Sequence, residues 1–225
     1  MVDLPAGRDD PSHLARNPLR EQIRRVLVDG LLAGRWQPGE RIVERRVAVE
    51  LNVSQAPVRE ALRELETLRL IESVPNKGAR VRDFGVADMA EIYPVRAGLE
   101  LVAAELAAPR LAEDARPLER EVEALRRATA DGDVEAQIKH SVEFHRQIVR
   151  AARNSVLSHT WESLGVEVWT RLSVRWLNME LHAKAADHAT ITDAFRARDP
   201  DVGRMVRDHV LNYVEAAVKS HDAVR

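Results

Sequence analysis

The sequence predicts a mostly α-helical protein with two domains: a small N-terminal one that ends in a β-hairpin, and a larger antiparallel bundle of helices. Its 225 residues exceed what one typical core needs and suffice for two. Ala, Leu, Val, Arg and Glu dominate, and 4% of the residues are aromatic, which favours helices over sheets. Apolar residues recur at helical spacing along most of the chain, with β-prone runs only around residues 71–81.

The composition also excludes several classes of protein. The chain has 0 cysteines, so disulfides, zinc knuckles and thiol chemistry are excluded. No run without Asp, Glu, Lys or Arg exceeds 8 residues, which is far short of a membrane span. Residues 1–20 carry both charge signs and lack the apolar stretch of a secretory signal, so we expect a cytoplasmic protein.

The charge is distributed unevenly along the chain. The net charge is −2, but residues 1–84 hold 15 Lys+Arg against 13 Asp+Glu, and the remainder holds 19 against 23. Global charge would therefore not attract nucleic acid. Any such binding must come from a local basic cluster in the N-terminal domain.

The first elements of the N-terminal domain follow from helical periodicity and its interruptions. Residues 1–17 are expected to be a flexible tail, because prolines and a glycine break every pattern there. A helix is predicted over 18–33, and the glycine- and proline-containing segment 34–39 ends it in a turn. A short second helix fits residues 43–51.

A third helix and a hairpin complete this domain. The helix is predicted from Pro57, a favoured first helical residue, with one apolar face. Two β-prone runs, 71–74 and 79–81, flank the segment Pro75-Asn-Lys-Gly78, which indicates a hairpin with a basic tip. Three helices followed by a two-stranded ribbon form the layout of a winged helix-turn-helix, which we assign to residues 18–83.

Residues 84–225 are predicted to form the helical bundle. No strand-like alternation of polar and apolar residues occurs after the linker at 83–86. The connections between helices are short, which implies antiparallel neighbours. The predicted helices cover residues 87–108, 115–131, 133–153, 155–177, 184–198 and 201–220.

Arg59 and Gln55 are candidates for contacting duplex DNA. Arg59 lies in the first turn of the third helix, opposite the buried face, where free N–H groups and the positive end of the helix dipole suit a phosphate. Gln55 would lie at the groove-facing entrance of the same helix. The simpler alternative for Arg59 is a surface ion pair with a neighbour of Arg63 on its own helix.

Two stretches resemble the GntR family of bacterial regulators: Gly34-Arg-Trp-Gln-Pro-Gly39, and Val53-Ser-Gln-Ala-Pro-Val-Arg-Glu-Ala-Leu62. The resemblance covers residues 18–83 and implies a DNA-binding domain whose wing enters the minor groove. By their positions in the family motifs, the residues expected to contact DNA are Arg45, Ser54, Gln55, Arg59, Lys77 and Gly78.

Three positions depart from the family pattern. Gln55 replaces the usual Arg, and Gln favours adenine where Arg favours guanine. Ala56 replaces Thr or Ser, so the third helix is expected to lose a cap. Arg69 replaces Gly, so the end of that helix must tolerate an unfavourable backbone turn.

His145, His188 and His209 are each a polar exception on the buried face of a different predicted helix. A single core histidine is usually just hydrogen-bonded to a neighbour, and this stays the simpler alternative. Three imidazoles in one core each need a buried partner, and one divalent metal ion would satisfy all three. Three protein nitrogens would leave a coordination position open for water or a ligand.

The second domain resembles the FCD-type effector domain of the FadR subgroup. The pieces that carry this resemblance are Glu91-Ile-Tyr-Pro-Val-Arg-Ala-Gly-Leu-Glu100, Phe144-His145, His188 and His209. The resemblance implies a zinc or nickel site of one Asp and three His, and Ser141 stands at the place of the Asp. It also implies a small organic acid as effector.

Arg96 is the candidate residue for holding that acid. It lies on an apolar stripe, where an unpaired guanidinium would be costly, and a guanidinium grips a carboxylate in bidentate fashion. The alternative for Arg96 is an ion pair with Glu100, one helical turn further on.

These features predict a ligand-responsive, DNA-binding repressor that dimerises through residues 84–225 and reads a palindromic operator. One alternative is a metal-dependent sensor without an organic effector. A second is a hydrolase built on the three histidines, although no Asp or Glu is an evident general base. A purely structural metal, or none, is the remaining alternative.

Overall fold

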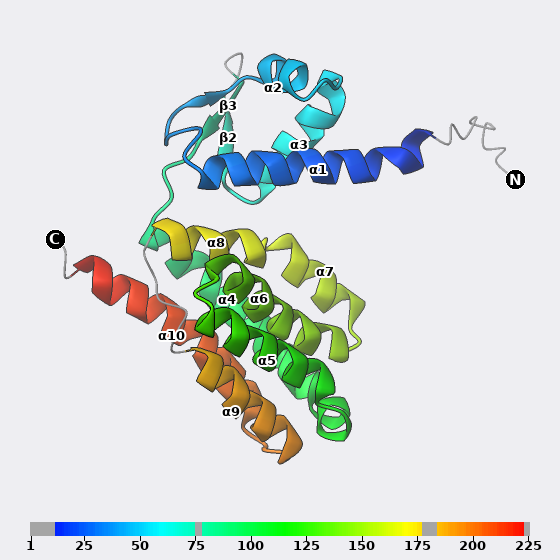
Figure 1. Cartoon of the computed structure of the whole chain (residues 1–225), viewed down its shortest axis with the longest axis vertical. Helices are drawn as coiled ribbons and strands as arrows, with labels where there is room; N and C mark the ends of the chain where they lie inside the picture. The colour runs from blue at the N-terminus through cyan, green and yellow to red at the C-terminus, as the bar shows by residue number, and fades with distance from the viewer. Residues whose placement is uncertain (1–11, 75–77, 177–183, 223–225) are drawn as a thin grey trace, which may run out of the picture. The chain divides into compact units, whose positions relative to one another are not determined.

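The computed structural model describes residues 12–74, 78–176 and 184–222 (Figure 1). The chain divides into two compact units, Met1–Asp83 and Phe84–Arg225. Within the described residues, one unit combines helices with a small sheet, and the regular structure of the other is all helical. The predicted fold class, a winged helix-turn-helix with a helical bundle, is confirmed.

The N-terminal unit is a helix-turn-helix with a three-stranded wing. Its sheet is antiparallel, in the order β1-β3-β2, with Ile71 paired to Val81 and Arg41 to Arg80. Leu27, Val58 and Leu65 lie fully buried where α1 and α3 pack together. The elements are α1 (Ser12–Leu32), β1 (Arg41–Ile42), α2 (Glu44–Glu50), α3 (Gln55–Thr67), β2 (Ile71–Val74) and β3 (Gly78–Val81).

Two predicted boundaries in this unit were wrong. The helix α1 begins at Ser12, so residues 12–17 are not a tail. Ser12 is a favoured residue at a helix start, and Pro18 removes only one backbone hydrogen bond near the N-terminal end of a long helix. The helix α3 begins at Gln55 with Ser54 at the N-cap, so Ala56 is not at the capping position. The Ser54 side chain makes no capping hydrogen bond.

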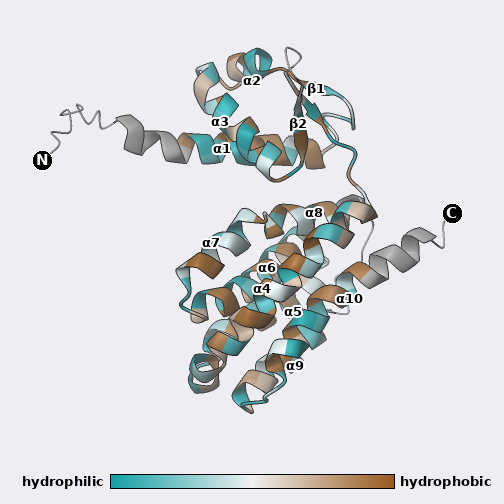
Figure 2. Ribbon diagram, turned by 180° about the vertical axis from the view of Figure 1, so that it is seen from behind, coloured by the Kyte–Doolittle hydropathy of each residue, from teal (hydrophilic) through white to brown (hydrophobic). Residues whose placement is uncertain are grey.

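The C-terminal unit is a bundle in which α4 packs most extensively against α10 and α6. The buried apolar residues of these helices form one core, and Figure 2 shows hydrophobic and hydrophilic stretches alternating along the ribbons. None of the helices in the described part of the chain is long and apolar enough to span a bilayer. The helices are α4 (Val86–Glu113), α5 (Arg116–Ala130), α6 (Val134–Ala151), α7 (Ser155–Ser163), α8 (Val166–Trp176), α9 (Lys184–Arg196) and α10 (Val202–Asp222).

Two predicted helix ends in the bundle were also wrong. Pro109 does not end α4, which continues to Glu113, because tertiary packing of Ala107 and Leu111 holds the last turn in place. The segment predicted as one helix over 155–177 is divided at Gly165, which has φ +66°. A left-handed glycine ends α7 and lets α8 leave in a new direction.

Candidate DNA-binding groove and candidate metal centre

A groove of about 550 Å³ opens between α2, α3 and the strands β1 and β3. It runs along α3 from Gln55 to Glu66, and so includes the N-terminal end of the helix, where free backbone N–H groups suit an anion. Four arginines and two glutamates line it together with Gln55: Arg41, Arg45, Arg59, Arg63, Glu44 and Glu66. The groove therefore has the mixed but mainly basic lining that suits contact with a phosphate backbone.

Arg59 projects into this groove from the first turn and a half of α3 and is 54% exposed. It does not pair with a neighbour on its own helix, as the alternative interpretation held. Its Nε donates to Glu44 Oε2 at 3.0 Å and its Nη2 donates to Glu44 Oε1 at 2.8 Å. Arg63 instead pairs with Glu60, at 2.8 Å.

The other residues predicted to contact DNA are distributed around the same groove. Arg45 on α2 and Gln55 at the start of α3 are exposed and line it. Ser54 is exposed beside Gln55 but is not part of the lining. Gly78 lines the wing side with φ +78°, a conformation that favours glycine, and Lys77 lies outside the described residues.

The predicted backbone turn at the end of α3 is confirmed. Arg69 adopts φ +58°, the left-handed region that L-residues rarely occupy. Its N–H donates to Glu66 O at 2.9 Å, and the following Leu70 N–H donates to Leu65 O at 2.9 Å. These bonds close the helix in the way a C-terminal glycine normally does.

The three candidate metal ligands meet in the core of the bundle. His145 on α6, His188 on α9 and His209 on α10 are all buried, and each offers a ring nitrogen within 4.8 Å of the other two. The ring centroids of His188 and His209 lie 4.6 Å apart, and His145 lies 5.3 Å from each. Ser141 Oγ is 3.5 Å from His188 Nε2, so it faces the cluster from one turn before His145.

A buried carboxylate lies beside this cluster. Glu100 Oε1 accepts from Arg96 Nε at 2.7 Å and from Trp161 Nε1 at 2.8 Å, while its Oε2 lies 2.6 Å from His145 Nδ1. Burial alone would raise the pKa of Glu100, but the charges of Arg96 and His145 reverse the effect and hold that pKa well below its usual range. The ion pair predicted as the alternative for Arg96 is therefore formed.

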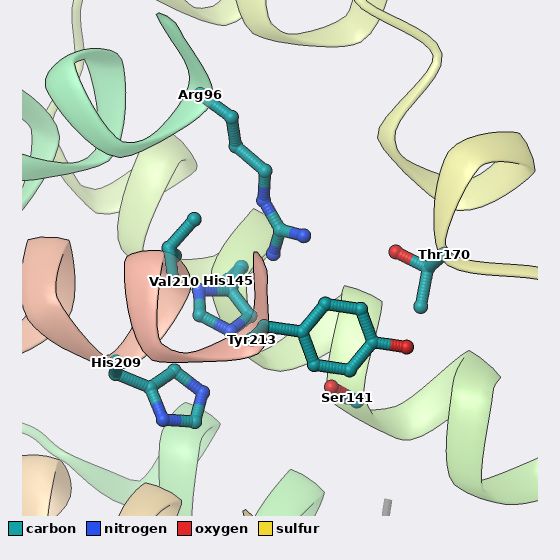
Figure 3. Close-up of a pocket in the computed structure, with 7 residues that line it drawn as sticks. All are labelled: Arg96, Ser141, His145, Thr170, His209, Val210 and Tyr213. Carbon is teal, nitrogen blue, oxygen red and sulfur yellow. The ribbon is translucent and has the colours of Figure 1, made fainter. Parts of the chain in front are cut away.

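A small cavity of about 20 Å³ adjoins the histidines (Figure 3). Figure 3 shows the guanidinium of Arg96 directed toward the space between His145 and Tyr213. Three hydroxyl-bearing side chains, Ser141, Thr170 and Tyr213, line the cavity together with His209 and Val210. The volume is roughly that of one water molecule.

Hydroxyl groups form a second buried cluster next to the cavity. Ser173 Oγ lies 3.2 Å from both Tyr93 Oη and Tyr213 Oη, and the two tyrosine rings stack at 5.5 Å. Burial raises the pKa of both tyrosines above the ordinary value, so both stay neutral phenols that can donate a hydrogen bond. The sequence analysis did not identify Tyr93, Thr170, Ser173 or Tyr213.

Comparisons with known proteins decide the family. The model of "Bacterial regulatory proteins, gntR family" matches residues 19–81, and the model of the FCD domain matches residues 91–212. The "Probable D-xylose utilization operon transcriptional repressor" of Paenarthrobacter nicotinovorans is 36% identical over 212 residues, 94% of each chain. The chain belongs to the GntR family.

Further relatives agree with this membership. This GntR-family chain is 30% identical to the "Nta operon transcriptional regulator" of Aminobacter aminovorans, over 80% of the chain and 85% of that protein. Its fold matches solved E. coli McbR/YncC with a TM-score of 0.67 and 24% identity, covering 92% and 99% of the two chains. The FCD domain places it in the FadR subgroup, and it is a transcriptional regulator rather than an enzyme.

The histidine cluster of this GntR-family regulator fits a divalent metal ion. Three imidazoles converge from three helices, and the Nδ1 atoms of two of them lie near a carboxylate: Glu100 Oε2 is 2.6 Å from His145 Nδ1, and Asp187 Oδ2 is 3.6 Å from His209 Nδ1. Carboxylates in that outer position orient metal-binding imidazoles in other proteins. Ser141, which the sequence resemblance places at the position of the Asp, offers a neutral hydroxyl to the cluster.

The structure also identifies polar partners that sequence reasoning missed. Arg41, Glu44 and Arg63 line the groove, but a lone charge on an exposed helix or a two-residue strand gives no signal by itself. Glu100 was considered only as a partner for Arg96. Its position on the buried stripe of α4 was the available sign that it contacts more than one buried group.

Proposed function

We propose that this regulator binds an operator duplex through the groove between α2, α3 and the wing. The observation that supports this most is the gathering of Arg45, Gln55 and Arg59 around one exposed groove at the N-terminus of α3. In this proposal Arg59 and Ser54 contact the phosphate backbone and Gln55 reads a base edge, with adenine as its natural partner. Gly78 at the start of β3, and Lys77 before it in the sequence, are the residues that we propose to contact the minor groove.

We propose that the histidine cluster and its cavity form the regulatory site. His145, His188 and His209 would hold a divalent metal ion, zinc or nickel, which supplies a Lewis-acidic position for a carboxylate or a water molecule. Arg96 would bind the carboxylate of a small organic acid, with Thr170 and Tyr213 available to donate or accept hydrogen bonds. Glu100 keeps the Arg96 guanidinium and the His145 ring in position for this.

The cavity volume explains why such an effector would change the protein. About 20 Å³ does not accommodate a molecule of even three carbons, so the walls formed by α8 and α10 must separate for it to enter. An effector that binds only the separated arrangement shifts the population toward it. Repression would then be released by the change in the bundle.

We also infer that two copies act together as a homodimer on a palindromic operator. One face of α4 exposes apolar side chains at helical spacing: Val95 is 52% exposed, Val102 43% and Leu106 44%. These three residues fall within about 20° of one line along the helix, by its 100° turn per residue. A second copy that places its own α4 on this line would bury the stripe, as a two-fold interface requires.

Operator selection from a random pool of duplexes tests the DNA-binding proposal. The wild-type protein is expected to enrich a palindrome with half-sites about one helical turn apart. Arg59→Ala is expected to weaken operator binding and to lower its salt dependence by about one phosphate contact. An unchanged enrichment and affinity with Arg59→Ala would contradict the proposal.

The small cavity favours a second candidate, a metal-dependent sensor without an organic effector. Arg96 already has a carboxylate partner in Glu100, and the cavity has room for a single water. In this case chelation alone would abolish operator binding, and a panel of mono- and dicarboxylic acids would leave the affinity of the metal-loaded protein unchanged.

A further inference from the structure

Glu44 places a carboxylate in the groove where a duplex would bring its phosphates. It is the first residue of α2, and its side chain is 24% exposed. A negative charge at that place weakens the attraction between the protein and every duplex, whatever its sequence. The chain therefore carries a group whose effect on non-specific affinity is unfavourable, in the centre of its basic surface.

The geometry of Glu44 indicates what this group does. Both of its carboxylate oxygens accept from one edge of the Arg59 guanidinium, from Nε at 3.0 Å and from Nη2 at 2.8 Å. A two-point contact of this kind fixes the orientation of the planar guanidinium, which a single contact does not. The Nη1 side is left as the part of the guanidinium that can meet an incoming acceptor.

The two residues lie 15 positions apart, on elements that the core holds rigidly. Val47 and Ala48 anchor α2, and Val58 and Ala61 anchor α3 on either side of Arg59. The distance spanned by the pair is therefore set by the packing of the two helices, and Arg59 is held in one place relative to the groove.

We propose that Glu44 is a specificity-determining positioning residue for DNA binding. It holds Arg59 so that the guanidinium meets a phosphate only when the duplex lies in one register, and its charge weakens the contacts of all other registers. Phosphate contacts fix register, and selectivity often depends on such an unfavourable element. This inference rests on the proposed DNA-binding function.

Glu60 provides a matched control. It is an exposed glutamate on α3, next to Arg59 in the sequence, and it pairs with Arg63 through one contact of 2.8 Å. It does not line the groove. Glu60→Gln removes the same charge as Glu44→Gln from the residue that follows Arg59, and it leaves the Glu44–Arg59 pair in place.

The experiment compares the affinity for the selected operator with the affinity for a random duplex of equal length, by fluorescence anisotropy at several salt concentrations. Glu44→Gln is expected to tighten random-duplex binding about fivefold and to lower the operator-to-random ratio about tenfold. Glu60→Gln is expected to change the ratio less than about twofold. With Arg59→Ala already present, Glu44→Gln is expected to change the ratio no further.

Equal effects of Glu44→Gln and Glu60→Gln would overturn the proposal, and so would a full effect of Glu44→Gln without Arg59. If Glu44→Gln lowers the thermal midpoint of unfolding sharply, Glu44→Asp replaces it. That variant keeps the charge and withdraws it by one methylene, so the ratio is expected to fall without tighter random binding. A ratio unchanged by Glu44→Asp would contradict the positioning role.

A measurement without DNA separates this inference from the function on which it rests. In the DNA-free protein the Arg59 Nε–H is expected to exchange slowly with water by NMR, and to lose this protection in Glu44→Gln but not in Glu60→Gln. Unprotected Arg59 Nε–H in the wild type would overturn the pair itself. A protected Arg59 in a protein that selects no duplex would overturn the DNA-binding proposal and, with it, the inference.

Discussion

Glu100 shows how much one buried side chain can support in this fold. Its carboxylate touches Arg96, Trp161 and His145, which come from α4, α7 and α6. A buried charge is tolerated only when its partners are present, so each of these contacts depends on the others. The proposed role of Arg96 as an effector ligand therefore depends on Glu100, which holds its guanidinium in place.

Replacement of this carboxylate is expected to destabilise the bundle strongly. Glu100→Ala leaves the Arg96 guanidinium buried without its counter-charge, which costs about 3 to 5 kcal/mol of unfolding free energy. The free energy of unfolding is measured by denaturant unfolding followed by circular dichroism. The control is Glu113→Ala, an exposed glutamate at the end of the same helix, for which a change within about 0.5 kcal/mol is expected. Equal effects of the two changes would contradict the account of the buried cluster.

Ser141 is the residue at which the proposed metal site departs from the family. Ser141→Asp adds an anionic ligand beside His188 and is expected to raise zinc affinity about tenfold or more. The same change is expected to lower the thermal midpoint of the metal-free protein, because it buries an unpaired carboxylate. Competition with a zinc-sensitive dye gives the zinc affinity. The control is the double variant Ser141→Asp with His188→Ala, which should lose the gain in zinc affinity. Unchanged zinc affinity in Ser141→Asp would indicate that position 141 does not face the metal.

At the scale of helices and strands, the periodicity of apolar residues in the sequence predicted most of the elements that the structure contains. The helices α5 and α6 lie within about one to two residues of their predicted ranges, and α3 has its predicted apolar face, because each helix packs one face against the core. The break at Gly165 and the continuation of α4 past Pro109 could not be predicted, because both depend on which distant residues pack against those turns. The two-residue strand β1 and the Glu44–Arg59 pair depend on partners far along the chain in the same way.

The exposed stripe on α4 leads to a prediction about assembly. Val102→Glu places a charge at the centre of the proposed two-fold interface and is expected to convert the dimer to a monomer. The control is Val156→Glu on α7, a more exposed and isolated valine at 74% exposure, which should leave the dimer intact. Light scattering after size-exclusion chromatography gives the mass. A dimer that survives Val102→Glu would place the interface elsewhere.

At the scale of the whole molecule, α8 connects the cavity to the start of the second unit. Thr170 on α8 lines the cavity, and one residue earlier the Trp169 ring meets Phe84, the first residue after the DNA-binding unit, at 6.2 Å. A shift of α8 caused by a ligand would therefore be transmitted to the linker. Arg45, Gln55, Arg59 and the three histidines were predictable from the sequence, whereas the contact between Trp169 and Phe84 is visible only in the packing.

Weakening the contact between Trp169 and Phe84 is expected to uncouple operator binding from zinc binding. Trp169→Leu should keep operator affinity and zinc affinity within about threefold of the wild type. The effect of bound zinc on operator affinity is expected to fall toward zero. Anisotropy titrations with and without zinc give the operator affinity and the effect of zinc on that affinity. The control is Leu172→Met on the same helix, a volume-conserving change that should preserve the coupling. Full coupling in Trp169→Leu would exclude this route.

The central claim is that occupancy of the histidine cluster controls operator binding by the groove around Arg59. Operator affinity measured in chelator, in zinc, and in zinc with a panel of small carboxylic acids tests it most directly. The account predicts that at least one of these changes alters the dissociation constant about tenfold, the usual size of an allosteric coupling, and that His188→Ala removes the change. An identical dissociation constant in all conditions, with zinc shown to be bound, would contradict it.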